Sequence, residues 1–280
     1  LMERKKGSHK GENGKVLIIG GSEEFVGSVV LAGLAALRAG CDVVTIAAPE
    51  KVAWAIHKYY PDLITHKISG KILTIKAAKD MVKLADRFDA VLIGNGITRK
   101  ADKFCQYFIK KSPQLKVIDS DALKSLSFKD FGNSIITPHG TELEMMLLNS
   151  GKEFLLPKLR MSNAKEKAEV LQGNLRYFLQ NNNVLLVKGP TDMIISKNKM
   201  SYNRTGKQGM TKAGTGDVLA GLVAGFLAKT QDPFKSAVAG AFINGLLGDQ
   251  LLKKKHGYAF IASDLLEARG KVLGTEKKRA

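Results

Sequence analysis

At 280 residues, of which 44% are hydrophobic, the chain is long enough to bury a large core, and this excludes disorder of the whole chain. Its 44 basic and 26 acidic residues give a formal charge of +18, but the lysines are spread along the sequence and aromatic residues make up only 7%, so we expect a solvated basic surface and no nucleic-acid partner. The two cysteines have no paired spacing, which excludes a disulfide framework.

The cysteines and the apolar runs also bear on location. Cys41 and Cys105 stand in apolar or mixed surroundings, which predicts two buried thiols in a reducing compartment. The longest apolar runs, such as 16–19 and 217–228, are too short or too glycine-broken to cross a bilayer. We therefore expect a cytoplasmic protein with no membrane partner.

Short β-branched runs alternate with longer helical stretches from residue 15 onward, which is typical of βαβ units around a mainly parallel sheet. Strands are predicted at 15–20, 42–47, 89–94, 116–119, 134–137, 184–188 and 193–196. Helices are predicted between them at 27–39, 77–87, 100–111, 141–148 and 164–181. After residue 201, three consecutive helices are predicted, at 217–228, 233–255 and 262–269.

This order of elements predicts an α/β fold: a doubly wound, mainly parallel central sheet flanked by helices, with a C-terminal helical layer. No repeat, low-complexity tract or long linker indicates a second domain, so we expect a single domain over 1–280. Residues 1–8 and 271–280 are basic, and we expect them to be flexible ends.

Two glycine motifs follow predicted strands. Gly20-Gly21-Ser22 precedes a helix opened by Gly27, and Gly94-Asn95-Gly96 ends the strand at 89–94. Glycines at the carboxyl edge of a sheet let the backbone approach a ligand, and a helix start favours an anion. A tight turn that packs helix on sheet explains either motif equally well. Neither motif has the spacing of a dinucleotide fingerprint, and the chain contains no P-loop sequence.

Polar residues follow two further strands. His139, after the strand at 134–137, could donate a hydrogen bond to a ligand, although a lone histidine is more often structural. Glu142 could cap the next helix or hold a cation through water. Lys188 could neutralise a phosphate or simply extend into water. The other histidines have no metal-ligand spacing, so we expect no protein metal site.

The most specific segment runs from Gly209 to Asp217 directly into an apolar helix. Gly214-Thr215-Gly216 at the helix start forms a pocket of backbone N–H groups that favours negative charge. Asp217, in the first turn, could act as the general base of a phosphoryl transfer, or it could only stabilise the helix N-terminus. Three glycines within a few residues are costly for simple capping, which favours the functional interpretation.

The motifs GGSEEFVGS, GNG, DSDAL, TPHGTE, VKGPTD and GMTKAGTGDVLAG occur in one order. In that order the chain resembles the NAD(P)H-hydrate dehydratases, a branch of the ribokinase-like superfamily, from residue 9 to about residue 267. The GTGD segment is shared by the whole superfamily, whereas the TPH segment and the opening segment narrow the resemblance to the dehydratase branch. The resemblance implies a single ribokinase-like catalytic domain. The few residues before His9 lead us to expect no companion epimerase domain, which some relatives carry.

The resemblance also implies a reaction and its residues. A nicotinamide ring hydrated at C6 would be restored to NADH or NADPH with ADP or ATP as co-substrate and Mg²⁺ as cofactor, the metal being held mainly by phosphate oxygens and water. Asp217 would deprotonate the ring hydroxyl for phosphorylation, and loss of phosphate would regenerate the double bond. The implied nucleotide-binding residues are Lys188, Gly189, Pro190, Thr191, Asp192, Gly214, Thr215 and Gly216, and the implied substrate-binding residues are Ser28, Gly96 and His139 together with Asp217.

Three positions depart from the family pattern: Ser28-Val29, Asn95 and Asp192. Asn95 replaces a proline, and each change keeps a small or polar group, so we expect altered contacts rather than an inactive site. An alternative function is a small-molecule kinase of the same superfamily that phosphorylates an alcohol such as a vitamin precursor. A binding protein without chemistry is a third, motivated by the charge of +18. The resemblance further implies a homo-oligomer, with a tetramer as the expected assembly.

Overall fold

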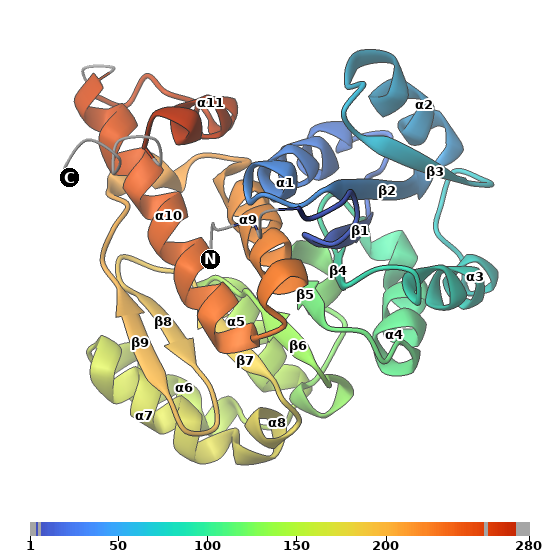
Figure 1. Cartoon of the computed structure of the whole chain (residues 1–280). Helices are drawn as coiled ribbons and strands as arrows, with labels where there is room; N and C mark the ends of the chain where they lie inside the picture. The colour runs from blue at the N-terminus through green and yellow to red at the C-terminus, as the bar shows by residue number, and fades with distance from the viewer. Residues whose placement is uncertain (1–3, 5–6, 255–256, 273–280) are drawn as a thin grey trace.

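The computed structural model describes residues 4, 7–254 and 257–272. Its centre is a nine-stranded sheet in the order β3-β2-β1-β4-β5-β6-β7-β8-β9 (Figure 1). The strands are β1 (Lys15–Ile19), β2 (Val43–Pro49), β3 (Ile64–Ile68), β4 (Ala90–Ile93), β5 (Lys116–Ile118), β6 (Ser134–Ile136), β7 (Val184–Val187), β8 (Asp192–Ile195) and β9 (Met200–Asn203). Strands β1 to β7 pair in parallel, and β8 is antiparallel to both of its neighbours. The predicted doubly wound, mainly parallel sheet is confirmed.

Helices cover both faces of the sheet. One face carries α1 (Val26–Arg38), α2 (Glu50–Tyr59), α9 (Thr215–Thr230) and α10 (Pro233–Lys254). The other carries α3 (Ile75–Ala85), α4 (Asp102–Lys111), α5 (Gly140–Asn149), α6 (Leu156–Met161), α7 (Ala164–Asn174) and α8 (Arg176–Gln180). The last helix, α11 (Ala262–Val272), packs on α1, α9 and α10, so the expected C-terminal helical layer is present (Figure 1).

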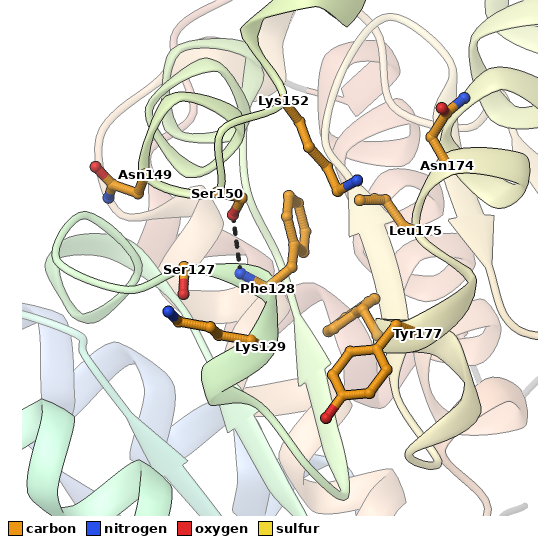
Figure 2. Close-up of a pocket in the computed structure, with 10 residues that line it drawn as sticks. Ser127, Phe128, Lys129, Asn149, Ser150, Lys152, Asn174, Leu175 and Tyr177 are labelled. Atoms are coloured by element: carbon orange, nitrogen blue, oxygen red, sulfur yellow. Dashed lines mark hydrogen bonds between the residues drawn. The ribbon is translucent and has the colours of Figure 1, made fainter.

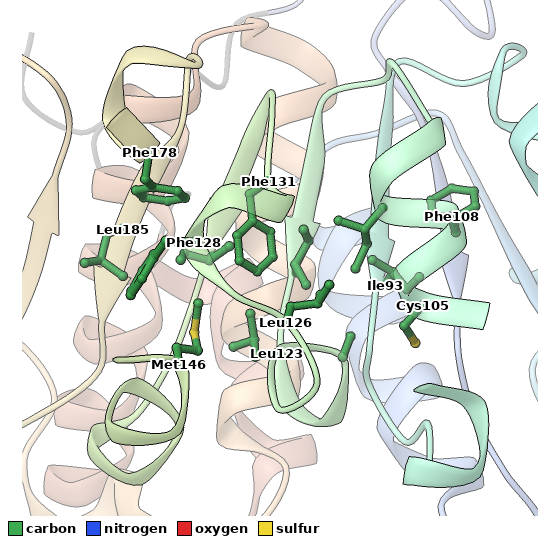
Figure 3. Close-up of a cluster of buried hydrophobic side chains, with 14 of the residues drawn as sticks. Ile93, Cys105, Phe108, Leu123, Leu126, Phe128, Phe131, Met146, Phe178 and Leu185 are labelled. Carbon is green, nitrogen blue, oxygen red and sulfur yellow. The ribbon is translucent and has the colours of Figure 1, made fainter. Parts of the chain in front are cut away.

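Alternation along the strands supplies both hydrophobic layers. In β1, Val16 and Ile18 enter the layer under α1 and α9, whereas Leu17 and Ile19 enter the layer on the opposite face. All four side chains are fully buried, as expected for a parallel strand covered by helices on both sides. Figure 3 shows the second layer, where Phe128 and Phe178 meet edge to face with ring centroids 5.3 Å apart.

Glycines allow α1 and α9 to approach closely. A Cβ atom on Gly221 would lie 2.1 Å from the carbonyl oxygen of Ala32, and one on Gly225 would lie 2.4 Å from the Cβ of Ala39. Only glycine fits at such distances. This contact holds α9 against α1 and thereby fixes where the first turn of α9 meets the sheet edge.

The observed elements differ from the predicted ones in four places. No element was predicted between residues 50 and 70, where the structure has α2 and β3. The edge strand β3 is only partly buried, and its mixed ITHKI sequence lacks the continuous apolar run of a central strand. The helix predicted at 164–181 is two helices, α7 and α8, because Leu175 leaves the helical conformation at φ −110° and ψ 24°. Helix α6 and strand β9 were also not predicted.

Other expectations concern the cysteines, the membrane and the chain ends. Both cysteines are buried, as predicted, and burial raises the pKa of the Cys105 thiol to about 12. Within the described ranges, no helix combines the length and the apolar character that crossing a bilayer requires. Of the two ends predicted to be flexible, residues 1–3, 5–6 and 273–280 lie outside the described residues. In the remainder, Arg4 Nη2 lies 2.9 Å from Asp42 Oδ1, and residues 271–272 belong to α11 and not to a flexible end.

A lysine is buried at the edge of the sheet where β5 begins, opposite the carboxyl ends of the strands. Lys116 is 1% exposed, and its Nζ donates to the carbonyl oxygens of Ser112 and Gln114 at 2.8 and 2.7 Å. Burial disfavours the charged amine and lowers the pKa of Lys116 to about 8, from an ordinary 10.5.

We expect Lys116→Met to flatten the dependence of stability on pH between about 8 and 10.5. Between about 8 and 10.5 the unfolded chain binds the lysine proton and the native protein does not, so the free energy of unfolding of the wild type rises with pH in that window. Below about pH 8, burial of the charged amine lowers the free energy of unfolding of the wild type by on the order of 1–3 kcal/mol. Denaturant unfolding below and above the window measures this difference. The exposed α4 substitution Lys103→Met should keep the wild-type slope, and the same slope in Lys116→Met would contradict the prediction.

Candidate active site

The carboxyl ends of the central parallel strands bring the sequence motifs together. The strand order reverses at β1: β2 and β3 lie on one side of it, whereas β4 and the strands that follow lie on the other side. Open α/β sheets bind ligands at such a point. The segments that follow β1, β4, β5, β6 and β7 contain Gly20, Asn95, Asp119, Thr137 and Lys188, respectively. The predicted gathering of motifs at one edge is therefore observed.

Helix α9 points its N-terminus at this edge. Gly214 precedes the first turn with φ 88°, a left-handed conformation that favours glycine. Thr215 anchors the turn, since its hydroxyl lies 2.7 Å from the carbonyl oxygen of Met210 and 2.8 Å from that of Lys212. The unpaired N–H groups of the helix start, around Gly216, favour an anion at this position.

Two acids and an amide form the centre of the site. Asp217, in the first turn of α9, accepts a hydrogen bond on Oδ1 from Nδ2 of Asn95 at 2.7 Å. The same Nδ2 donates to Oδ2 of Asp119 at 3.1 Å. Asp119 is 3% exposed and also accepts a hydrogen bond from the hydroxyl of Thr137 at 2.7 Å.

Lys188 provides the positive charge next to these acids. Its Nζ lies 2.8 Å from Oδ1 of Asp119 and 3.8 Å from Oε2 of Glu142. Burial lowers the pKa of Lys188, but the charges of Asp119, Glu142 and Asp217 outweigh burial and raise the pKa above its ordinary value. The lysine is therefore protonated, and the neighbouring acids balance part of its charge. Its side chain does not simply extend into water.

The surroundings of Asp217 make its carboxylate a stronger base than an exposed aspartate. Burial raises the pKa of Asp217, and the negative charge of Asp119 raises it further. Hydrogen bonds from Asn95 and Ser28 and the charge of Lys188 lower this pKa without cancelling the rise. A carboxylate with a raised pKa takes up a proton more readily, which suits a general base.

A cavity of about 640 Å³ adjoins the cluster. Among the predicted nucleotide-binding residues, it is lined by Lys188, Gly189, Pro190, Asp192, Thr215 and Gly216, and predicted substrate-binding His139 also lines it. Three more basic residues line it, namely Arg204, Lys207 and Lys212. A cavity of this size with basic walls beside a helix N-terminus suits a nucleoside phosphate.

Asp192 helps to shape one wall of this cavity. Its Oδ1 accepts from the backbone N–H of Gly189 at 3.0 Å, and its Oδ2 accepts from Nδ2 of Asn203 at 2.9 Å. Burial raises the pKa of Asp192. Through these two hydrogen bonds, the Asp192 side chain closes the turn between β7 and β8.

Four predicted residues, besides Asp217 itself, do not line the cavity: Ser28, Gly96, Thr191 and Gly214. Ser28 and Gly96 are neighbours, because a Cβ on Gly96 would lie 3.2 Å from the Cβ of Ser28. The Ser28 hydroxyl also hydrogen-bonds Asp217. Both residues therefore lie next to Asp217, in the segments that follow β1 and β4. Of the three predicted substrate residues other than Asp217, His139 alone lines the cavity, and Ser28 and Gly96 do not.

Of the two interpretations of Glu142, helix capping is confirmed. Glu142 Oε2 accepts from the backbone N–H of His139 at 2.9 Å at the start of α5. Its Oε1 lies 3.4 Å from Nε2 of His139, whose side chain is half exposed. His139 is therefore held at the cavity rim with one side open to solvent.

Asp119 and Thr137 were not predicted as site residues from the sequence. Asp119 directly follows β5, so its place at the sheet edge was a usable signal. The basic residues at 204–212 lie in a loop without periodicity, and no local pattern indicates that they line the cavity.

A second cavity, of about 280 Å³, lies away from this site (Figure 2). It is lined by Ser127, Phe128, Lys129, Asn149, Ser150, Lys152, Asn174, Leu175, Tyr177 and Phe178. None of these residues belongs to the predicted site, and no buried charge faces this space. The 640 Å³ cavity, which adjoins Lys188 and the start of α9, is therefore the candidate ligand site.

Comparisons with known proteins agree with the geometry. Residues 16–270 match the family model described as NAD(P)H-hydrate dehydratase. The bifunctional NAD(P)H-hydrate repair enzyme Nnr of Methanothermobacter thermautotrophicus is 37% identical over 276 residues, which cover 95% of this chain and 51% of that protein. The ADP-dependent (S)-NAD(P)H-hydrate dehydratase of Cenarchaeum symbiosum is 33% identical over 270 residues, covering 94% and 90%. This chain thus spans about half the length of the bifunctional relatives.

Solved structures show the same fold. The Bacillus subtilis ADP/ATP-dependent NAD(P)H-hydrate dehydratase, co-crystallised with ATP and Mg²⁺, superposes with a TM-score of 0.79 at 25% identity, covering 98% of this chain and 93% of that one. A ribokinase from Cryptococcus neoformans in complex with ADP superposes with a TM-score of 0.60 at 13% identity, covering 92% and 99%. The second likeness concerns the fold alone, and it confirms the predicted ribokinase-like architecture.

Proposed function

Because this chain belongs to the NAD(P)H-hydrate dehydratase family, we propose that it restores hydrated NADH and NADPH to the intact dinucleotides, using ADP or ATP. The observation that carries the proposal is the position of Asp217. It stands in the first turn of α9, next to Gly216 on the wall of the 640 Å³ cavity, with a raised pKa caused by burial and by Asp119. The activity is thus a hydro-lyase reaction coupled to nucleotide cleavage.

The first step proposed for these residues is a phosphoryl transfer. Asp217 accepts the proton of the hydroxyl on C6 of the hydrated ring, and the hydroxyl oxygen attacks the terminal phosphorus of the nucleotide. The bond to the bridging oxygen breaks, and AMP or ADP leaves with that electron pair. The N–H groups at Gly214–Gly216 stabilise the negative charge on the transferring group, and Lys188 balances the charge of the phosphate chain.

The second step is an elimination. The C–O bond to the new phosphate breaks, inorganic phosphate leaves with the electron pair, and the neighbouring ring carbon loses a proton to form the double bond. The transferred phosphoryl group thereby makes a poor leaving group, hydroxide, into a good one. Overall, one water is removed from the ring and one nucleotide phosphoanhydride is hydrolysed.

The proposed cofactor is Mg²⁺, bound through the nucleotide. Among the residues that the structure describes, no cluster of three acid, histidine or cysteine side chains could hold a metal by itself. Glu142 already caps α5 and faces Lys188. The described side chains around the cavity therefore fit a cation that is held mainly by phosphate oxygens and water, as Mg²⁺ commonly is. When bound, the ion would neutralise charge on the phosphate chain.

Location and assembly belong to the same proposal. Location in the cytoplasm is supported by two buried cysteines with no disulfide between them. A homo-oligomer, with a tetramer as the assembly, is supported by large apolar side chains exposed on α2 and β3, where Trp54, Tyr59 and Ile64 are 53%, 68% and 52% exposed. Light scattering of the purified chain tests the assembly directly.

The deciding experiment supplies the purified chain with hydrated NADH, Mg²⁺ and either ADP or ATP. We expect the absorbance of reduced nicotinamide to return, with one inorganic phosphate released for each NADH restored, and neither to occur without nucleotide or in the presence of a magnesium chelator. A stable phosphorylated alcohol without released phosphate would instead support a kinase. No recovery with either nucleotide would overturn the proposal.

A further inference from the structure

Asn95 lies between the two acids of the site. It follows β4, is fully buried, and places Nδ2 2.7 Å from Asp217 and 3.1 Å from Asp119. Only the NH₂ end of an amide can donate to two carboxylates, and the Asn95 Oδ1 has no partner among the described residues. The two acids therefore determine the orientation of this amide.

The backbone holds Asn95 in this place. Its carbonyl oxygen accepts from the N–H of Gly21 at 2.9 Å, which ties the turn to the end of β1. Gly94 and Gly96 have φ values of 124° and 68°, both in the region that favours glycine. A Cβ on Gly94 would lie 1.9 Å from the carbonyl oxygen of Asp119, so the turn also lies directly against the end of β5.

The charges around Asp217 explain why such an amide matters. Asp119 faces Asp217 with the same charge, whereas Lys188 faces both with the opposite charge and is shared with Glu142. Asp119 is buried and lies 2.8 Å from Lys188 Nζ, so without a donor between them the two acids would repel each other in a medium of low dielectric constant. Each of the two N–H groups of Asn95 satisfies one carboxylate, and together they link Lys188, Asp119 and Asp217 in one hydrogen-bonded chain.

We infer that Asn95 is a positioning residue for the reaction, which holds the carboxylate of Asp217 ionised and in one orientation by bridging it to Asp119. This inference rests on the proposed function for its kinetic consequence. Among the influences that lower the pKa of Asp217, the hydrogen bond from Asn95 is the largest. Removal of the amide therefore raises the pKa of Asp217 and makes its protonation at mildly acidic pH more extensive.

The kinetic test is the pH dependence of kcat/KM for the wild type, Asn95→Ala and Asn95→Ser. In Asn95→Ala the acidic limb should move to higher pH, so that the loss on that limb exceeds the loss on the alkaline plateau by at least about tenfold, one pKa unit. Asn95→Ser keeps one donor and should recover part of the shift. If Asn95→Ala fails to fold, the serine variant carries the comparison. An acidic limb that stays in place in both variants would refute the positioning role.

A second measurement does not depend on turnover. Carboxyl-carbon NMR of the full chain labelled at aspartate, with Asp217 assigned through its missing signal in Asp217→Asn, follows the titration of this one group. Its midpoint should be higher in Asn95→Ala than in the wild type, and an unchanged midpoint would refute the inference. If the wild type proves inactive in the repair assay but the midpoint is still higher in Asn95→Ala than in the wild type, the proposed function is refuted and the inference stands.

Asn183→Ala is the matched control. Asn183 is 1% exposed and makes three hydrogen bonds, accepting from Ser134 and donating to the carbonyl oxygens of Phe131 and Phe178, far from the site. Its loss costs stability through buried polar groups left without partners, as the loss of Asn95 does. We expect lower thermal stability with an acidic limb at the wild-type position. A shift of that limb in Asn183→Ala as well would show that any destabilisation moves it, and the inference would fail.

Discussion

Asp217→Asn should lower kcat for the repair of hydrated NADH by at least about a thousandfold, the scale expected for loss of a positioned general base. The asparagine keeps the shape of the side chain and can still accept a hydrogen bond from Asn95, but it cannot take up the proton of the substrate hydroxyl. Because the backbone N–H groups of α9 and Lys188 remain, the Kd for ADP or ATP should change by less than about threefold. Nicotinamide absorbance and calorimetric nucleotide titration measure the two quantities.

The same variant should be more stable than the wild type at neutral pH. The pKa of Asp217 is raised by burial, so between the unfolded value of 3.8 and the folded value the native state binds the extra proton. The free energy of unfolding therefore falls as pH rises through that window, and above it the ionised group costs stability. Asparagine removes this cost together with the repulsion from Asp119. Calorimetry at neutral pH should show a higher Tm for the variant.

This pair of effects separates the two interpretations of Asp217. A residue that only stabilised its helix N-terminus would, when replaced, lower the Tm and leave turnover intact. Asp102→Asn is the matched control, since Asp102 lies in the first turn of α4 and its ion pair, among the residues that the structure describes, is with Arg99 at 3.5 Å. We expect it to cost less than about 1 kcal/mol and to keep full activity. Wild-type kcat in Asp217→Asn would contradict the mechanism.

The second large effect is expected from Lys188→Met. Methionine has a similar length but no charge, so Asp119 and Glu142, with side chains only 4% and 5% exposed, lose their cationic neighbour. Breaking a buried pair in this way costs about 3–5 kcal/mol. The cost should be largest at neutral pH and should shrink as the pH falls, because protonation of the uncompensated acids relieves it. Nucleotide affinity should fall by at least about tenfold, since one phosphate-facing charge is lost.

Denaturant unfolding at several pH values and nucleotide titration measure this prediction. Lys103→Met serves as the control, because it removes the same charge from an exposed position on α4. Its stability should stay within about 0.5 kcal/mol of the wild type. If both lysine variants unfold alike and bind nucleotide alike, then Lys188 neither balances the buried acids nor contacts the phosphate chain.

Much of this site follows from the order of short motifs in the chain. The runs that end in Gly20, Gly94, Thr137 and Lys188 are apolar and β-branched, and parallel strands bring their carboxyl ends to one edge whatever the intervening helices do. The glycines before Asp217 likewise predict a helix start that can receive an anion. These are local properties, and the apolar runs that alternate with helical stretches along the chain are sufficient to predict them.

Other features could not be read from local pattern. Nothing in the ITHKI run marks β3 as a strand, because an edge strand needs only one neighbour and little burial. The departure at Asn95 was noted, but its two acceptors lie 24 and 122 residues further along the chain. Contacts of this separation arise only when several strands and a helix are packed together.

The chain order of the motifs therefore predicted the family, the parallel sheet and a site at the carboxyl edge of that sheet. The tertiary structure alone decided the electrostatics: that Lys188 is shared by Asp119 and Glu142, that one amide joins Asp119 to Asp217, and that burial raises the pKa of the proposed base. The reason is that secondary structure depends on neighbours along the chain, whereas a pKa depends on the charges, donors and solvent within a few ångströms in space.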